Sequence, residues 1–508
     1  MSARGSLAGE LILAIDVGLT NCKAVLFDLD GSIVRRAGVP YETMRPAPDR
    51  VEQDPESWWQ ATVEAVHAVM TPAVAGQRRH QGPPRIAAIG VTAHMHALAC
   101  LDRGLRPLGM ALILGDRRAT QEADEIGREV GEELIYSRTG TAMDPSMPAA
   151  KIRWLWAHER EAWSATAWFV GCKDYVRARM TGQVATEPVD ACATSLYDIG
   201  RAEWCAPIAE AARARLDALP PILPPEAIAG GLLPDAAAQL GLPAGTPVVV
   251  GAGDDVEVLG NGLLDGGMRL EHLGTTGSIL AVVEAAVLDP ARALELYPHT
   301  IKGLWVLGGS MTAAGAALEW AAGALGYRSL TEASACLRGW PTAPGAPFFL
   351  PNLEGARTPR REPFARGAWL GMGRDTTRDD LMLAAFEGVA QGIQAILART
   401  EELAGARGPI AVSAGESADP RWLQLRADVY GSPLAVLATS EPTALGLFTL
   451  AAAALGVDES PAGAVRRVVR TQRLVEPVPV PSCERRLMLA DLVGRTLAGV
   501  WPVLSGVG

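Results

Sequence analysis

The segment from Leu11 to Asp28 reads Leu-Ile-Leu-Ala-Ile-Asp-Val-Gly-Leu-Thr-Asn-Cys-Lys-Ala-Val-Leu-Phe-Asp. Two apolar runs flank a short polar turn that contains glycine, and this pattern predicts a β-hairpin. Asp16 comes near the end of the first run, so we expect its carboxylate at the mouth of the hairpin.

The same kind of segment recurs in the second half of the chain. A strand-like run over 268–273 leads into Gly274-Thr275-Thr276-Gly277, and a second apolar run follows over 278–283. Strands mixed with helices indicate an α/β fold, here as two lobes built on one plan. Periodicity predicts further strands over 86–91 and 248–250, and helices over 55–70, 121–136 and 378–403.

The length of the chain also indicates two domains. It has 508 residues, and single hydrophobic cores stop growing at roughly 250 to 300 residues. We place the boundary before the second hairpin, which gives domains over residues 1–265 and 266–508.

Composition excludes several classes of function. The net charge is −11, whereas a nucleic-acid-binding protein needs clustered Lys and Arg. The seven cysteines are scattered and include no C-x-x-C pair, so neither a disulfide framework nor a zinc site is predicted. The apolar run that begins at Leu11 ends at Asp16, too soon for a signal sequence or a membrane span. We expect a cytoplasmic protein.

The segment Val248-Val249-Val250-Gly251-Ala252-Gly253-Asp254-Asp255 runs from a buried strand into a glycine turn that presents two acids. An aspartate fixed at the end of a strand can accept the proton of a substrate hydroxyl that attacks a phosphoryl group. From this segment alone, an aspartate that merely caps the turn is an equally good interpretation.

The turn over 274–277 offers backbone N–H groups and two hydroxyls, which suit phosphate oxygens. The sequence contains neither G-x-x-x-x-G-K-[ST] nor a well-placed G-x-G-x-x-G. A P-loop enzyme and a Rossmann dehydrogenase are therefore not supported.

Several segments resemble, in the expected order, the motifs of the FGGY carbohydrate kinases, and within that family those of the xylulose kinases most closely. In the first half, residues 15–23 resemble I-D-x-G-T-[ST]-x-x-K and residues 90–97 resemble G-x-S-G-Q-M-H-G. Residues 51–59, 114–118, 173–182 and 190–194 are similar to other family blocks. In the second half the similar segments are 354–359, 419–433 and 441–446.

The resemblance implies two ribonuclease H-like domains of the actin and hexokinase type around a central cleft. Residues 1–265 would bind the sugar, and residues 266–508 would bind ATP with Mg²⁺. It implies that Asp254 is the catalytic base and that Asp16 is an acid near the metal and the phosphates, with both as metal ligands.

The resemblance also implies one group of residues that bind the sugar and another that bind the nucleotide. Sugar-binding residues would be Met95, His96, Asp116 and Asp255. Nucleotide-binding residues would be Gly18, Thr20, Lys23, Gly274, Thr275, Gly315 and Gly415. A small sugar and ATP are the expected partners, without nucleic acid or membrane, and a homodimer is compatible with this assignment.

Three departures from the xylulose kinase pattern fall in the presumed sugar pocket. His94 replaces Gln, Asp255 replaces Asn, and Leu114-Gly115 replaces Trp-Asn. An acid in place of an amide loses two donors and adds a charge, so the set of hydroxyls that can be satisfied must change. Near the nucleotide, Glu416 stands where the family has glycine.

The substrate therefore stays open at this point. A ketopentose such as D-xylulose is one candidate, and L-xylulose, ribulose, erythritol and gluconate are others. A catalytically silent sugar-sensing module of the same fold is a further alternative, against which the presence of both Asp16 and Asp254 counts.

Overall fold

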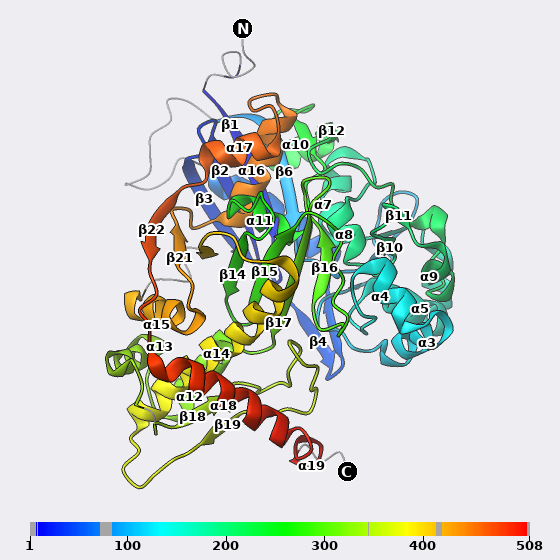
Figure 1. Ribbon diagram of the computed structural model, residues 1–508. Helices are drawn as coiled ribbons and strands as arrows, with labels where there is room; N and C mark the ends of the chain where they lie inside the picture. The colour runs from blue at the N-terminus through cyan, green and yellow to red at the C-terminus, as the bar shows by residue number, and fades with distance from the viewer. Residues whose placement is uncertain (1–6, 8, 72–83, 344, 413–418, 505–508) are drawn as a thin grey trace. The chain divides into compact units, whose positions relative to one another are not determined.

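The computed structural model describes residues 7, 9–71, 84–343, 345–412 and 419–504 (Figure 1). Two compact units account for the contacts of the chain, and each is assembled from segments distant in sequence. Unit 1 comprises Met1–Gly262, Tyr297–Leu304 and Glu441–Val469, and unit 2 comprises Leu263–Leu296, Trp305–Ser440 and Arg470–Gly508.

Unit 1 is built on a six-stranded sheet with the order β12-β13-β6-β1-β2-β3. Strands β1 and β2 form the predicted hairpin, which is confirmed, and β1 and β13 both run parallel to β6. The strands are β1 (Glu10–Val17), β2 (Asn21–Asp28), β3 (Ile33–Pro40), β6 (Arg85–Ala93), β12 (Ile228–Gly231) and β13 (Pro247–Val249).

Helices cover both faces of this sheet. Alternate residues of β1, namely Leu11, Leu13 and Ile15, pack in one cluster with residues of α2 (Pro55–Met70). On the other face, Gly90 of β6 leaves room for Leu447 of α16 (Pro442–Ala454). Strands buried on both sides read as continuous apolar runs, which explains the composition of β1.

Local sequence explains where the helices of unit 1 begin and end. Asp54 caps α2 by accepting from the N–H of Glu56, with Pro55 in the first turn, and the predicted helix over 55–70 is confirmed. The predicted helix over 121–136 is instead two helices, α3 (Thr120–Val130) and α4 (Glu132–Thr139). Gly131 separates them with φ of 89°, because a left-handed residue interrupts the helical path.

Unit 2 repeats this plan in a seven-stranded sheet with the order β16-β17-β15-β14-β20-β21-β22. The hairpin β14–β15 is antiparallel, and β14, β20 and β21 are parallel neighbours. The strands are β14 (Arg269–Leu273), β15 (Gly277–Val283), β16 (Glu295–Pro298), β17 (Trp305–Met311), β20 (Ile410–Val412), β21 (Leu434–Leu437) and β22 (Thr471–Val475). Two α/β units on one plan are therefore confirmed.

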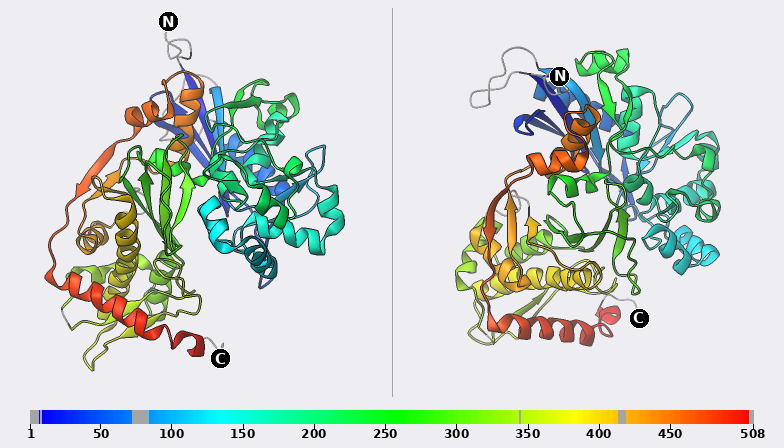
Figure 2. Two further views of the ribbon diagram at one scale, coloured as in Figure 1. Left: turned by 45° about the vertical axis from the view of Figure 1, so that its right-hand side comes forward. Right: turned by 45° about the horizontal axis from the view of Figure 1, so that its top comes forward.

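The long helix α14 (Arg378–Ala404) packs in the core of unit 2. It is long and apolar enough to cross a membrane, but 72% of its most apolar window is buried inside the protein, as expected of a core helix. Arg486 of α18 (Pro481–Leu497), the long red helix in Figure 2, forms a buried ion pair with Glu387 of α14.

The remaining helices and short strands fill the periphery of the two units. Those that bear on the site are α5 (Pro148–His158), α7 (Cys172–Thr181), α8 (Pro188–Cys192), the 3₁₀ turn Asp254–Val256, α11 (Glu257–Gly260), α12 (Gly315–Ala324), α15 (Pro420–Tyr430) and α17 (Pro461–Val468).

Candidate active site

The carboxyl ends of three parallel strands of unit 1 lie at one edge of its sheet. Asp16, the next-to-last residue of β1, pairs in register with Thr92 of β6 and with Lys23 of β2. The turn that carries Asp254 follows the third strand, β13. In open α/β sheets ligands bind outside this edge, so the fold brings Asp16 and Asp254 to the position where a site is expected.

The turn before Asp254 depends on two glycines that allow close approach of other residues. A Cβ on Gly251, whose φ is +75°, would lie 2.0 Å from the carbonyl oxygen of Val91. A Cβ on Gly253 would lie 2.7 Å from Sδ of Met95 and 3.0 Å from Oδ1 of Asp190. Larger residues do not fit here, because real Cβ contacts this short would force the backbone apart.

The carboxylate of Glu187 holds this turn through hydrogen bonds. Its Oε1 accepts from the N–H groups of Gly253 and Asp190, each at 2.9 Å, and its Oε2 accepts from Val189 at 2.7 Å. The side chain is fully buried. Burial raises the pKa of Glu187, while Lys173 and the three N–H groups oppose the rise.

Acidic side chains crowd around Asp254. Desolvation by the surrounding protein raises its pKa well above the usual value, and the charges of Asp255, Glu257, Asp190 and Asp16 raise it further. The neighbouring acids therefore act in the same direction as desolvation, since each negative charge makes ionisation of Asp254 less favourable. A carboxylate whose proton affinity is raised in this way suits a general base.

Two other acids of the cluster have shifted pKa values. Desolvation raises the pKa of Asp16 to about 6, with Lys23 lowering it and Glu441 and Glu257 raising it. Desolvation also raises the pKa of Asp190 to about 7 although it pairs with Lys173, whose Nζ lies 3.2 Å from Oδ2. The motifs indicated neither Glu257 nor Asp190 as part of this cluster.

Met95 and His96 come just after β6 and therefore lie at the same edge of the sheet. His96 has a left-handed backbone, with φ of 64°, and its Nδ1 lies 3.0 Å from the carbonyl oxygen of Ala193. The buried Nζ of Lys151 donates to the carbonyl of His96 at 2.7 Å and to that of Ile113 at 2.9 Å. Desolvation lowers the pKa of Lys151 to about 7.

Asp116 and Asp255 differ in what they present. Asp116 is fully buried, and its carboxylate accepts from the Arg118 guanidinium and, at 2.8 Å, from the N–H of Val51. Its oxygens thus hold the protein's own loop in this structure. Asp255 is half-buried directly after Asp254. Sugar binding by either residue stays a prediction.

The turn of the first hairpin lies beside Asp16. The N–H of Gly18 donates to the carbonyl of Asn21 at 2.9 Å, and Thr20 is exposed. Lys23 forms an ion pair of 3.3 Å with Glu441, a residue from 418 positions further along the chain. Its position before α16 in the sequence gave no sign of this contact.

The acids fit a divalent cation only with help from a bound substrate. Among the described residues no group of three or more His, Cys, Asp or Glu side chains is placed to hold a metal ion. Mg²⁺ usually takes one or two carboxylates and completes its shell with water and phosphate oxygens. Asp16 and Asp254 could supply these one or two carboxylates, and the surplus of negative charge around them favours a cation.

In unit 2 the turn after β14 packs on the first residues of α12. The carbonyls of Gly274 and Thr275 accept from the N–H groups of Ala314, Gly315 and Ala316 at 2.9 to 3.1 Å. A Cβ on Gly315 would lie 2.5 Å from the carbonyl oxygen of Gly274. The structure therefore brings Gly274, Thr275 and Gly315 together, with the Thr275 side chain exposed. Gly415 and Glu416 lie outside the described residues.

Comparison with known proteins agrees with this geometry. Residues 11–259 match the N-terminal domain of the FGGY family of carbohydrate kinases, and residues 272–455 match its C-terminal domain. Xylulose kinase of Escherichia coli (strain K12) is 30% identical over 429 residues, which cover 84% of this chain and 86% of that protein. Gluconokinase of Bacillus subtilis (strain 168) is 28% identical over 465 residues, 88% of each chain.

A solved structure extends the match to nearly the whole chain. The crystal structure of xylulose kinase from Rhodospirillum rubrum is 28% identical, with a TM-score of 0.87 over 97% of this chain and 100% of that one. Xylulose and gluconate kinases are similar to the chain to comparable degrees, so the comparisons leave the sugar open. With both domains matched in order, the chain belongs to the FGGY family of carbohydrate kinases.

Proposed function

We propose that the protein transfers the terminal phosphoryl group of ATP to a hydroxyl of a neutral sugar, a ketopentose such as D-xylulose. The observation that carries this proposal is the acid cluster around Asp254 at the carboxyl ends of β1, β6 and β13. The first domain, near residues 1–265, is proposed to bind the sugar in the cytoplasm, and the second to bind the nucleotide.

Asp254 is proposed to act as the general base. Its carboxylate accepts the proton of the sugar hydroxyl while the hydroxyl oxygen bonds to the phosphorus and ADP leaves. The raised pKa of Asp254 strengthens it as a proton acceptor. Glu187 keeps the turn in place by holding the N–H of Gly253. Mg²⁺, held by Asp16, Asp254 and phosphate oxygens, would supply positive charge for the transferring group.

Nucleotide binding is proposed for the turn of Gly274 and Thr275 in unit 2. Its support is the close packing of this turn against the start of α12, which Gly315 permits. The exposed Thr275 hydroxyl can donate to a phosphate oxygen.

The charge of the site favours a neutral sugar over an aldonate. Asp16, Asp190 and Asp254 lie together with Asp255, Glu257 and Glu441. Within the described part of the chain, Lys23, Arg36 and Lys173 form ion pairs with members of this group, so the acids still outnumber the cations. A sugar carboxylate would meet this excess of negative charge and pay for desolvation as well. Gluconate stays the second candidate, because a gluconokinase is 28% identical to the chain.

The test is coupled ADP release with ATP and Mg²⁺ over a panel of sugars. D-xylulose, L-xylulose, D-ribulose, erythritol and D-gluconate form the panel, and a glucose sample serves as the hexose control. We expect one neutral sugar to give kcat/KM at least tenfold above D-gluconate. A preference for D-gluconate would replace the neutral substrate with an aldonate, and no sugar-dependent ADP release from folded protein would favour a sensing module.

A further inference from the structure

A small cavity in unit 1 is lined by Met95 and His96 together with other polar and apolar side chains. Its volume is about 30 Å³, and His94, Asp190 and Thr194 are among the residues that line it. A water molecule needs roughly 10 to 15 Å³ of such space. The cavity therefore has room for a water molecule or one hydroxyl-bearing group of a ligand, but not for a whole sugar.

His94 is the unusual residue of this cavity. Its side chain is 4% exposed, and within the described part of the chain neither ring nitrogen makes a hydrogen bond. Its backbone N–H donates to the carbonyl of Val17 at 3.0 Å, and its ring meets Trp58 edge to face at 5.7 Å between centroids. Backbone and ring packing thus fix the imidazole, while its two nitrogens make no hydrogen bond with the residues that the structure describes.

Such an arrangement is costly unless a ligand compensates for it. Most buried polar side-chain atoms have a partner, and an unpaired one costs about 1–3 kcal/mol. An apolar residue of similar size at position 94 would avoid this cost. A buried histidine that lines a cavity together with Asp190 of the acid cluster indicates a group reserved for a ligand.

The imidazole is neutral under ordinary conditions. Burial lowers the pKa of His94 to about 4, Lys151 and His96 lower it further, and a nearby backbone group of Met95 opposes this only in part. In a neutral imidazole one nitrogen donates and the other accepts a hydrogen bond. His94 therefore presents one donor and one acceptor to the cavity.

We propose that His94 is a specificity-determining residue that receives a hydroxyl group from the non-reacting end of the sugar and disfavours a carboxylate there. This inference rests on the sugar kinase function proposed above. A hydroxyl can donate to the unprotonated ring nitrogen or accept from the protonated one, so it can pair with whichever nitrogen it meets. A carboxylate only accepts, so the unprotonated ring nitrogen would face it with a lone pair.

Two substitutions separate recognition from packing. His94→Gln keeps a donor and an acceptor, and His94→Leu keeps much of the volume but removes both. The sugar of the panel with the highest turnover is measured in coupled ADP release, and D-xylulose and D-gluconate binding is measured by calorimetry without nucleotide. His158→Gln is the matched control, because His158 is half-exposed at the end of α5 and does not line the cavity.

We expect His94→Leu to raise KM and the dissociation constant of the neutral sugar about 10- to 100-fold, with a smaller change in kcat. His94→Gln should stay within about fivefold of the unchanged protein. Without sugar, His94→Leu should unfold at a higher temperature, by on the order of 2 °C, because it removes unpaired polar atoms from the interior.

The opposite pattern would overturn the inference. If His94→Leu left KM and sugar binding within twofold and lowered the unfolding temperature, His94 would be a packing residue. Failure of calorimetry to detect any sugar would also overturn it. Failure of the proposed kinase function would give a different result. Sugar binding that depends on His94, without any ADP release, would support this inference and contradict phosphoryl transfer.

Discussion

The two hairpins of the molecule share a topology but differ in the residues at their turns. In unit 1 the hairpin β1–β2 lies next to the parallel strand β6, and in unit 2 the hairpin β14–β15 lies next to the parallel strand β20. In the first hairpin Asp16 lies at the end of β1 next to the turn, and in the second Gly274 and Thr275 follow β14 in the turn.

The difference shows that the scaffold sets positions and the turn residues set chemistry. Acids at the first position gather negative charge, which suits proton acceptance and a divalent cation. Glycine and threonine at the second expose backbone and hydroxyl groups, which suit phosphate oxygens. The comparison predicts that substitutions in unit 1 affect the chemical step and the sugar, and that substitutions in unit 2 affect the nucleotide.

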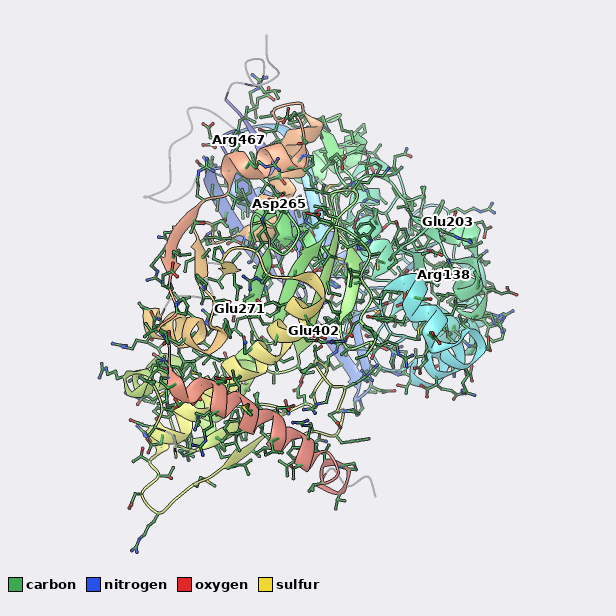
Figure 3. The ribbon with its side chains drawn as sticks, viewed as in Figure 1. Arg138, Glu203, Asp265, Glu271, Glu402 and Arg467 are labelled. Carbon is green, nitrogen blue, oxygen red and sulfur yellow. The ribbon has the colours of Figure 1, made fainter. Side chains whose placement is uncertain are left out.

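The largest effect is expected from Asp254→Asn. The amide cannot accept the hydroxyl proton, so we expect kcat to fall about 10³-fold while sugar binding in calorimetry changes less than threefold. Asp265→Asn is the control, because Asp265 (labelled in Figure 3) is exposed and is not among the charges that raise the pKa of Asp254. A variant that keeps a tenth of the turnover would remove Asp254 from the role of base and break the assignment of chemistry to unit 1.

The next effect concerns stability in unit 2. Glu271 of β14 (labelled in Figure 3) is buried. Its Oε2 lies 2.6 Å from Nη1 of Arg426, and its Oε1 accepts from the Tyr430 hydroxyl. Glu271→Gln removes the negative charge that pairs with Nη1 of the buried Arg426, so we expect a loss of about 3 kcal/mol in the free energy of unfolding.

Denaturant unfolding measures this loss. Glu402→Gln on the exposed side of α14 is the matched control, since its ion pair with Arg399 is at the surface and is expected to contribute less than about 0.5 kcal/mol. Equal effects of the two substitutions would show that the buried pair does not support the strand that leads to the nucleotide turn.

A third substitution separates nucleotide from sugar. The Cβ of Gly315→Ala would press on the carbonyl of Gly274, so the turn must shift. We expect KM for ATP to rise about tenfold, with KM for the sugar unchanged, because a displacement near 1 Å at a positioned group is costly. Gly323→Ala in the same helix is the control, since its Cβ would have no atom within 4 Å. Equal changes for both substrates would contradict the division of roles.

The smallest effect is a pH dependence that belongs to unit 1. Burial lowers the pKa of Lys151 from 10.5 to about 7 in the folded protein. Between these values the unfolded chain binds the proton and the folded chain does not, so this lysine makes stability rise with pH. We expect Lys151→Met to lose this rise, by about 1 kcal/mol between pH 7 and 8, in unfolding experiments. Parallel curves for the two proteins would show that the ammonium is not desolvated.

Much of the candidate site could be predicted from the sequence because strands and glycine turns leave local patterns. The hairpin with Asp16, the strand before Asp254 and the turn at Gly274 were all found in this way, and the structure contains each of these elements. The prediction of one helix over 121–136 was wrong, because the helical periodicity continues across Gly131, where a backbone with positive φ separates two helices. The catalytic and binding roles of these residues stay predictions.

Residues that act from a distance could not be found by pattern. Glu187 lies between two family blocks and Asp190 opens one of them, yet Glu187 holds the N–H of Gly253 and Asp190 approaches that glycine. Lys151 lies in a helix that carries no motif, but it ties the carbonyls of His96 and Ile113 together. No periodicity reports such contacts, because they join segments through single side chains.

The sequence by itself determined the α/β class, the two hairpins and the acids at the strand ends, since these depend on local periodicity and turn chemistry. Only the tertiary structure decided that residues 441–469 return to unit 1, where Gly446 of α16 approaches the carbonyl of Val256 so closely that a Cβ would lie 2.2 Å away. The same return brings Glu441 to Lys23. Contacts across hundreds of residues follow from packing of complementary surfaces, which a linear pattern does not encode.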